Sequence, residues 1–71
     1  GFAHFVADGQ LNLKANITMS SVAVFDITGK QVIAQNLTST NAQVNLAGLN
    51  TGVYIARVSI EGSEESFKFV K

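Results

Sequence analysis

Apolar and polar residues alternate along most of this chain with a period of two, which is typical of β-strands that turn one face to a core. In residues 11–17 the apolar positions that share one face are Leu11, Leu13, Ala15 and Ile17. In residues 53–60 we assign to the core the face that carries Tyr54, Ala56, Val58 and Ile60. Helical spacing fits these positions poorly, so both segments are predicted to be strands.

The end of the chain continues the alternation. Phe67 and Phe69 are expected to return to the core, whereas the outward positions are Ser66, Lys68 and Val70. Residues 2–7 form another predicted strand, and a short one is expected where apolar residues return in residues 44–49.

Residues 22–27 are apolar on both faces. Val22 and Val24 point one way, whereas Ala23, Phe25 and Ile27 point the other way. This pattern indicates a strand that is covered on both sides or shifted by a bulge, and the alternative is an exposed contact patch around Phe25. We favour burial of Phe25 over an exposed patch.

Glycine residues punctuate the predicted strands. Thr28 and Gly29 are expected to form a tight turn between residues 22–27 and 31–37, and Gly52 and Gly62 mark further turns. The count is about seven short strands, which predicts an all-β fold built as an antiparallel β-sandwich, with a small barrel as the alternative. No internal repeat or linker is visible, so residues 1–71 are interpreted as one domain.

Composition supports a folded domain and narrows its partners. Apolar residues make up 46% of the 71 residues and charged residues 14%, a ratio typical of a core-forming chain. Five basic and five acidic side chains balance, so neither nucleic acid nor an anionic membrane surface is an expected partner. The apolar run at residues 22–25 is far shorter than the roughly 18 residues of a membrane-spanning helix. We also expect a monomer, although exposed strand edges permit dimers or strand exchange.

Candidate chemistry is sparse. His4 is the only histidine and cysteine is absent, so we assign no metal site and expect no cofactor. Asp8 and Asp26 are interpreted as turn residues rather than calcium ligands. Three acidic residues cluster at the final hairpin, where a solvated tip offers no cleft for acid and base catalysis: Glu61, Glu64 and Glu65. Nucleophile elbows and phosphate-binding loops are missing, so we do not expect an enzyme.

Three motifs occur in a fixed order along the chain. Residues 22–32 read VAVFDITGKQV, a strand, turn and strand around the motif residues Asp26, Gly29 and Lys30. Residues 49–54 read LNTGVY, and residues 67–71 read FKFVK. Together they resemble the D-x-x-G-[KR], L-x-x-G-x-Y and final-strand elements of the C-terminal sorting domain of the type IX secretion system (the Por secretion system), in its type A form. The Asn-Pro element common in that family is absent here.

This resemblance implies an immunoglobulin-like sandwich at the end of a larger cargo protein from the Bacteroidetes group. The implied role is non-catalytic: the domain directs cargo from the periplasm across the outer membrane, so the cargo becomes secreted or displayed at the cell surface. A surface sorting peptidase often removes the domain, and any cleavage site is expected at or before Gly1.

A sandwich with free edge strands can pair its backbone with a partner, and the final strand is our candidate for this role. We expect translocon or shuttle proteins to recognise Gly52, Tyr54, Phe67, Lys68, Phe69, Val70 and Lys71.

Two other functions remain open at this point. The chain could be an immunoglobulin-like accessory or adhesion module of a secreted surface protein or hydrolase, in which Phe25, Tyr54 or Arg57 contacts a ligand. A sugar-binding platform normally carries several aromatic residues, and this chain has one tyrosine and no tryptophan. The second alternative is a structural spacer domain.

Overall fold

The computed structural model describes residues 1–71 and contains seven strands. In chain order they are β1 (Phe2–Ala7), β2 (Gln10–Ala15), β3 (Met19–Asp26), β4 (Gln31–Asn36), β5 (Asn41–Asn45), β6 (Val53–Ile60) and β7 (Ser63–Val70). No helix is present, so the prediction of an all-β fold with about seven short strands is confirmed. The predicted turns after β3 and β6 are also confirmed, with φ of 89° at Gly29 and 78° at Gly62.

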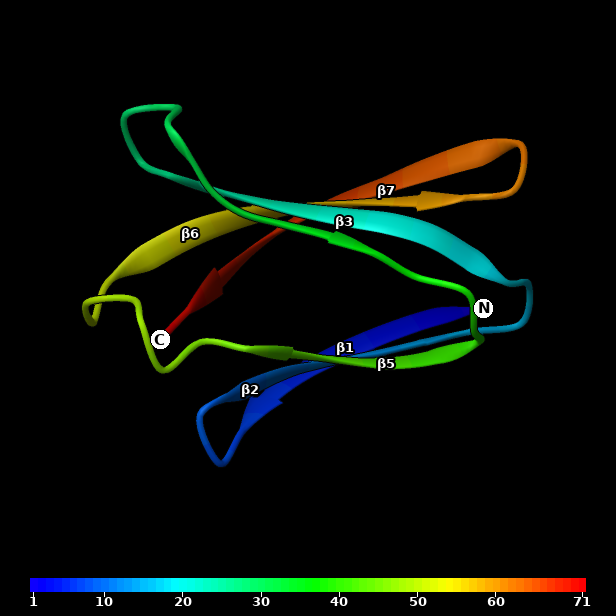
Figure 1. The fold of residues 1–71 in the computed structure, drawn as a ribbon, viewed down its shortest axis with the longest axis horizontal. Helices are drawn as coiled ribbons and strands as arrows, with labels where there is room; N and C mark the ends of the chain where they lie inside the picture. Colours follow the sequence, from blue (N-terminus) through cyan, green and yellow to red (C-terminus); the bar gives the residue numbers. More distant parts are fainter.

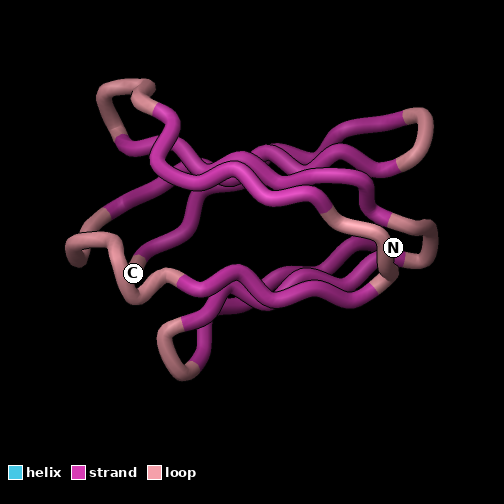
Figure 2. Tube along the Cα trace, in the orientation of Figure 1, coloured by secondary structure: helices cyan, strands magenta, loops and turns pink.

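The strands form two antiparallel sheets that face each other (Figures 1 and 2). One sheet has the order β1-β2-β5 and the other has the order β4-β3-β6-β7. Constant-type immunoglobulin domains place the fourth strand beside the fifth, whereas here β4 pairs with β3. The other strands keep the immunoglobulin order, so the architecture is an immunoglobulin-like β-sandwich. Because the strands form two separate sheets, the alternative of a closed barrel is excluded.

The core lies between the two sheets and is entirely apolar. Fourteen residues are buried, and none of them is polar or charged apart from the hydroxyl of Tyr54. The predicted inward face of β6 is confirmed, because its four residues are 0–8% exposed: Tyr54, Ala56, Val58 and Ile60. The prediction for Ile17 is wrong. Strand β2 ends at Ala15, and Ile17 lies in the connection to β3 with 52% of its surface exposed.

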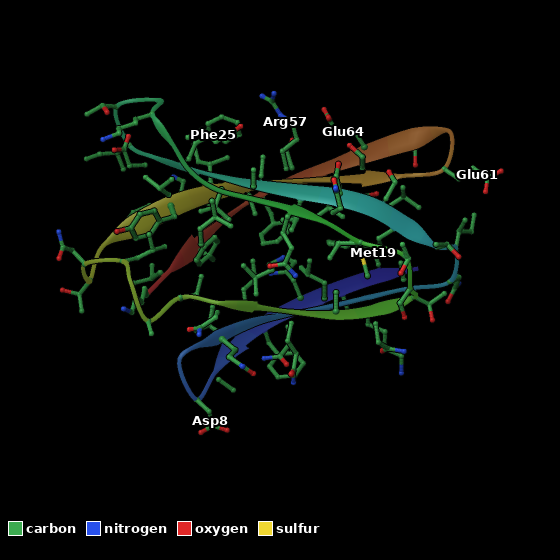
Figure 3. The ribbon with its side chains drawn as sticks, in the orientation of Figure 1. Asp8, Met19, Phe25, Arg57, Glu61 and Glu64 are labelled. Atoms are coloured by element: carbon green, nitrogen blue, oxygen red, sulfur yellow. The ribbon has the colours of Figure 1, made fainter.

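Strand β3 has one buried face. Val22 and Val24 point into the core, but Phe25 is half-buried on the outer face and Ile27 is 76% exposed in the following turn. The expectation that this strand is covered on both sides is therefore wrong, because no third layer lies outside the sheet. The predicted bulge is present, as a register shift between Val24 and Phe25 in the pairing with β4. Phe25 is partly shielded by Arg57, whose guanidinium carbon lies 5.3 Å from the ring centroid (Figure 3).

Aromatic side chains from the two edge strands β1 and β7 meet on one side of the sandwich. The rings of His4 and Phe67 stack with centroids 3.7 Å apart, and Phe2 lies 5.7 Å from Phe67. Phe69 is buried as predicted, whereas Phe67 is only partly buried and packs against the core. His4 therefore serves as a packing residue of the sandwich.

Candidate recognition site

Two of the sequence motifs join to form one substructure at one end of the four-stranded sheet. The register of β6 and β7 places Val53 opposite Val70 and Tyr54 opposite Phe69. Beyond the strands, the Gly52 N–H donates to the Lys71 carbonyl oxygen at 3.2 Å, and the Lys71 N–H donates to the Gly52 carbonyl oxygen at 2.9 Å. The 49–54 motif and the 67–71 motif, far apart in sequence, are thus paired along their backbones (Figure 1).

The loop before β6 is held by two side chains. The Tyr54 hydroxyl donates a hydrogen bond of 2.7 Å to the carbonyl oxygen of Asn50, four residues upstream. This arrangement is like the tyrosine corner of Greek-key sandwiches. On the other side of the loop, the Lys71 ammonium donates to the carbonyl oxygen of Leu49. The Tyr54 ring also packs on Phe69, with centroids 5.9 Å apart, so the loop is tied to the core.

The seven predicted recognition residues divide into two groups by their orientation. Tyr54 and Phe69 are 7% and 6% exposed, so their side chains build the site and are not accessible to a partner. Lys68 is exposed and Val70 is 64% exposed, and both lie on the outer face of β7. Lys71 is half-buried and its ammonium is engaged by Leu49. Of the two lysines, Lys68 alone presents a free charged group.

Strand β7 forms one edge of its sheet, so half of its backbone groups have no strand partner. The reciprocal bonds of Lys71 with Gly52 mark a hydrogen-bonded pair. Such pairs alternate along an antiparallel ladder, so the backbone groups directed away from β6 belong to Glu64, Ser66, Lys68 and Val70. The outward side chains and the free backbone groups therefore belong to the same residues.

The motif residues Asp26, Gly29 and Lys30 form the turn between β3 and β4. Asp26 lies opposite Tyr54 in the β3 and β6 register, so this turn is at the same end of the sheet as Gly52. The Asp26 Oδ1 accepts hydrogen bonds from the Thr28 hydroxyl at 2.6 Å, the Thr28 N–H at 2.9 Å and the Lys30 N–H at 3.0 Å. These bonds, above all the one from the Thr28 hydroxyl, lower the pKa of the Asp26 carboxyl. The carboxylate thus stabilises the turn itself.

The remaining candidate groups are not gathered into a metal-binding cluster. The three glutamates lie at the opposite end, at and beside the β6–β7 hairpin, where Glu64 Oε1 is 3.7 Å from Arg57 Nε (Figure 3). No three side chains of His, Cys, Asp or Glu lie close enough together to hold a metal ion. The structure contains no helix with the length and apolarity of a membrane span.

Sequence reasoning missed three contacts that shape this site. All three join residues that are distant along the chain. They are the contact of Arg57 with the Phe25 ring, the stacking of His4 on Phe67, and the hydrogen bond from Lys71 to Leu49. The single available signal was the parity of each residue in its strand, which predicts a face but no particular partner.

Comparison with known families agrees with this arrangement. A family model described as the secretion system C-terminal sorting domain matches residues 7–71, which include every strand from β2 to β7. The chain therefore belongs to the family of C-terminal sorting domains of the type IX secretion system. A search of curated proteins finds no matching relative.

Proposed function

We propose that this domain is the export address of a larger cargo protein and that it has no catalytic role. It directs the attached cargo from the periplasm across the outer membrane through the type IX system, to the cell surface or the medium. After export, a surface sorting peptidase removes the domain. Family membership over residues 7–71 supports the sorting role.

The proposed contact with the translocon or its shuttle is the open edge of β7 next to the Gly52 loop. One observation carries this assignment: the free backbone groups, Lys68 and Val70 lie together on a strand whose end is fastened to Gly52. An incoming strand would gain affinity from the backbone of β7 and selectivity from the Lys68 charge. The buried residues Tyr54 and Phe69 would keep this edge in place.

The alternative of a ligand-binding accessory module receives less support. Tyr54 is buried with its hydroxyl engaged by Asn50, and Phe25 is half-buried beneath Arg57. Neither ring offers a free flat face of the kind that binds sugars.

The sorting role is tested by fusing residues 1–71 to the C-terminus of a fluorescent protein with a Sec signal peptide. We expect the fusion at the surface or in the medium of a bacterium with a working type IX system, and in the periplasm of a strain without it. Retention of the folded fusion in the periplasm of both strains would refute the sorting role.

The contact at β7 is tested separately with Lys68→Ala. We expect delivery to fall while Lys14→Ala, a matched loss of an exposed lysine on the other sheet, leaves it unchanged. Both substitutions are at exposed positions and should change the free energy of unfolding by less than about 0.5 kcal/mol, which urea denaturation checks. Full delivery of Lys68→Ala would show that the Lys68 charge is not read, without affecting the sorting role.

A further inference from the structure

Strand β7 is the longest of the four sheet edges. It has eight residues and pairs with β6 without a register shift, whereas β4, at the other edge of the same sheet, is interrupted by the bulge beside Phe25. Natural proteins protect edge strands with charged side chains, proline, bulges or short length. The chain contains no proline, and β7 is neither short nor bulged, so its charged side chains are its only protection of this kind. Its charged residues are therefore the main determinant of which strand can pair with it.

The charges of β7 are arranged so that a second copy of the strand complements the first. Glu64 and Glu65 lie in its first half and Lys68 in its second half, and Lys71 follows directly after the strand. When two such strands run antiparallel about Ser66, Glu64 of each copy faces Lys68 of the other. The two-fold axis produces this opposite-charge pair twice, and opposite charges directly across a strand pair are stabilising.

The hydrogen-bonding pattern selects the same register. Glu64, Ser66 and Lys68 all direct their backbone groups to the open edge, so Ser66 with Ser66 and Glu64 with Lys68 both meet as hydrogen-bonded pairs. A shift by one residue would place the free backbone groups of one copy opposite backbone groups of the other copy that are already bonded to β6. A shift by two residues would place Glu64 opposite Val70 or Ser66 of the second copy, and both ion pairs would be lost.

We propose that two copies of this domain associate through β7, antiparallel about Ser66, into a continuous eight-stranded sheet. The proposed dimer departs from the monomer expected from the sequence. Because Glu64 and Lys68 are on the exposed outer face, the paired charges stay in water, so the dimer is weak and sensitive to salt. If the proposed function is correct, the dimer also covers the edge that the translocon reads, so export requires the monomer.

Sedimentation velocity of residues 1–71 tests the association itself. Concentrations from about 10 µM to about 1 mM cover the range of a weak complex. We expect a monomer–dimer equilibrium that shifts to monomer between about 0.02 M and about 1 M salt. Amide chemical shifts should change with concentration at Glu64, Ser66 and Lys68. A monomer at all concentrations would overturn the proposal. Shifts confined to β1 or β5, the edges of the other sheet, would overturn it too.

Charge reversal tests the register. Glu64→Lys and Lys68→Glu each place like charges opposite one another twice, so each alone should weaken dimerisation by about tenfold. The double variant Glu64→Lys with Lys68→Glu restores opposite charges and should recover the dimer to within about threefold of the original. Arg57 is opposite Ser66, so positions 64 and 68 both lie diagonally across from it on β7. In the double variant Arg57 can therefore pair with the glutamate at position 68 in place of the one at position 64.

Lys14→Glu is the matched control, since it reverses an exposed lysine on the other sheet and should leave dimerisation unchanged. Circular dichroism and urea denaturation establish that all variants are folded. Equal dimerisation of the single and double variants, or failure of the double variant to recover, would refute the register.

Discussion

Substitution of Tyr54 by Phe isolates the hydrogen bond that anchors the loop of the candidate recognition site. The change removes the hydroxyl that donates to the Asn50 carbonyl oxygen at 2.7 Å and keeps the ring. Packing on Phe69, at a centroid distance of 5.9 Å, is therefore retained. Any loss of stability therefore measures the hydrogen bond to Asn50 and not the packing of the core.

The expected loss follows from the position of this bond. A neutral hydrogen bond contributes about 1 kcal/mol net, and an acceptor left without a partner adds a further cost only when water cannot reach it. This hydrogen bond is partly buried, so water can only partly replace the hydroxyl at the freed carbonyl oxygen. We expect the free energy of unfolding to fall by about 1 kcal/mol. For a domain of this size, that loss lowers Tm by about 4–8 °C.

Urea denaturation followed by circular dichroism measures this change. The midpoint should fall while the m-value stays the same, because the surface exposed on unfolding is unchanged. The amide signals of Gly52 and Lys71 should persist, since their backbone bonds do not depend on the hydroxyl. An unchanged midpoint would refute the reasoning and show that the Gly52 pairing and the Lys71 bond to Leu49 hold the loop without Tyr54. Export of the folded variant should continue.

Two further predictions concern the core and the turn. Phe69→Ala removes a ring that is 6% exposed and should lower the free energy of unfolding by about 3–5 kcal/mol. The urea midpoint should therefore fall much further than in Tyr54→Phe. A loss below about 1 kcal/mol would contradict the place of Phe69 in the core. Asp26→Ala removes the acceptor of three hydrogen bonds and should lower Tm at neutral pH. Because folding lowers the pKa of Asp26 from 3.8, its stabilisation is present above that value and is lost as the pH falls through the folded pKa. Thermal melts at neutral and strongly acidic pH should therefore show a smaller acid-induced fall in Tm for Asp26→Ala than for the parent, and an equal fall would refute the role of the carboxylate.

The strands and turns were predictable because their causes are local. Alternation placed Tyr54, Ala56, Val58 and Ile60 on the buried face of β6, and the need for positive φ placed Gly29 and Gly62 in the turns. Prediction failed where the alternation of apolar and polar residues continues beyond the end of the strand. Ile17 continues the alternation of β2, but the strand has already ended at Ala15.

Phe25 illustrates a second limit. An apolar side chain on each face of β3 suggests two covering layers, yet a chain of 71 residues forms only the two sheets of one sandwich. The outer face of β3 consequently remains at the surface, where the Arg57 side chain lies over the ring. Whether an apolar residue is buried depends on the number of layers, and a single strand carries no information about that number.

The sequence by itself determined the all-β class, the predicted turns, the inward face of β6 and the motifs that indicate the sorting-domain family. The class, the turns and the inward face depend on residues within a few positions of one another, and each motif is itself a short local segment. The tertiary structure alone decided that β7 lies at a sheet edge, that Lys71 pairs with Gly52, and that Lys68 is exposed while the Lys71 ammonium is engaged by Leu49. The physical reason is that strand order and register arise from packing and hydrogen bonding between segments distant in the chain. Period-two alternation defines the faces of a strand but not its neighbours.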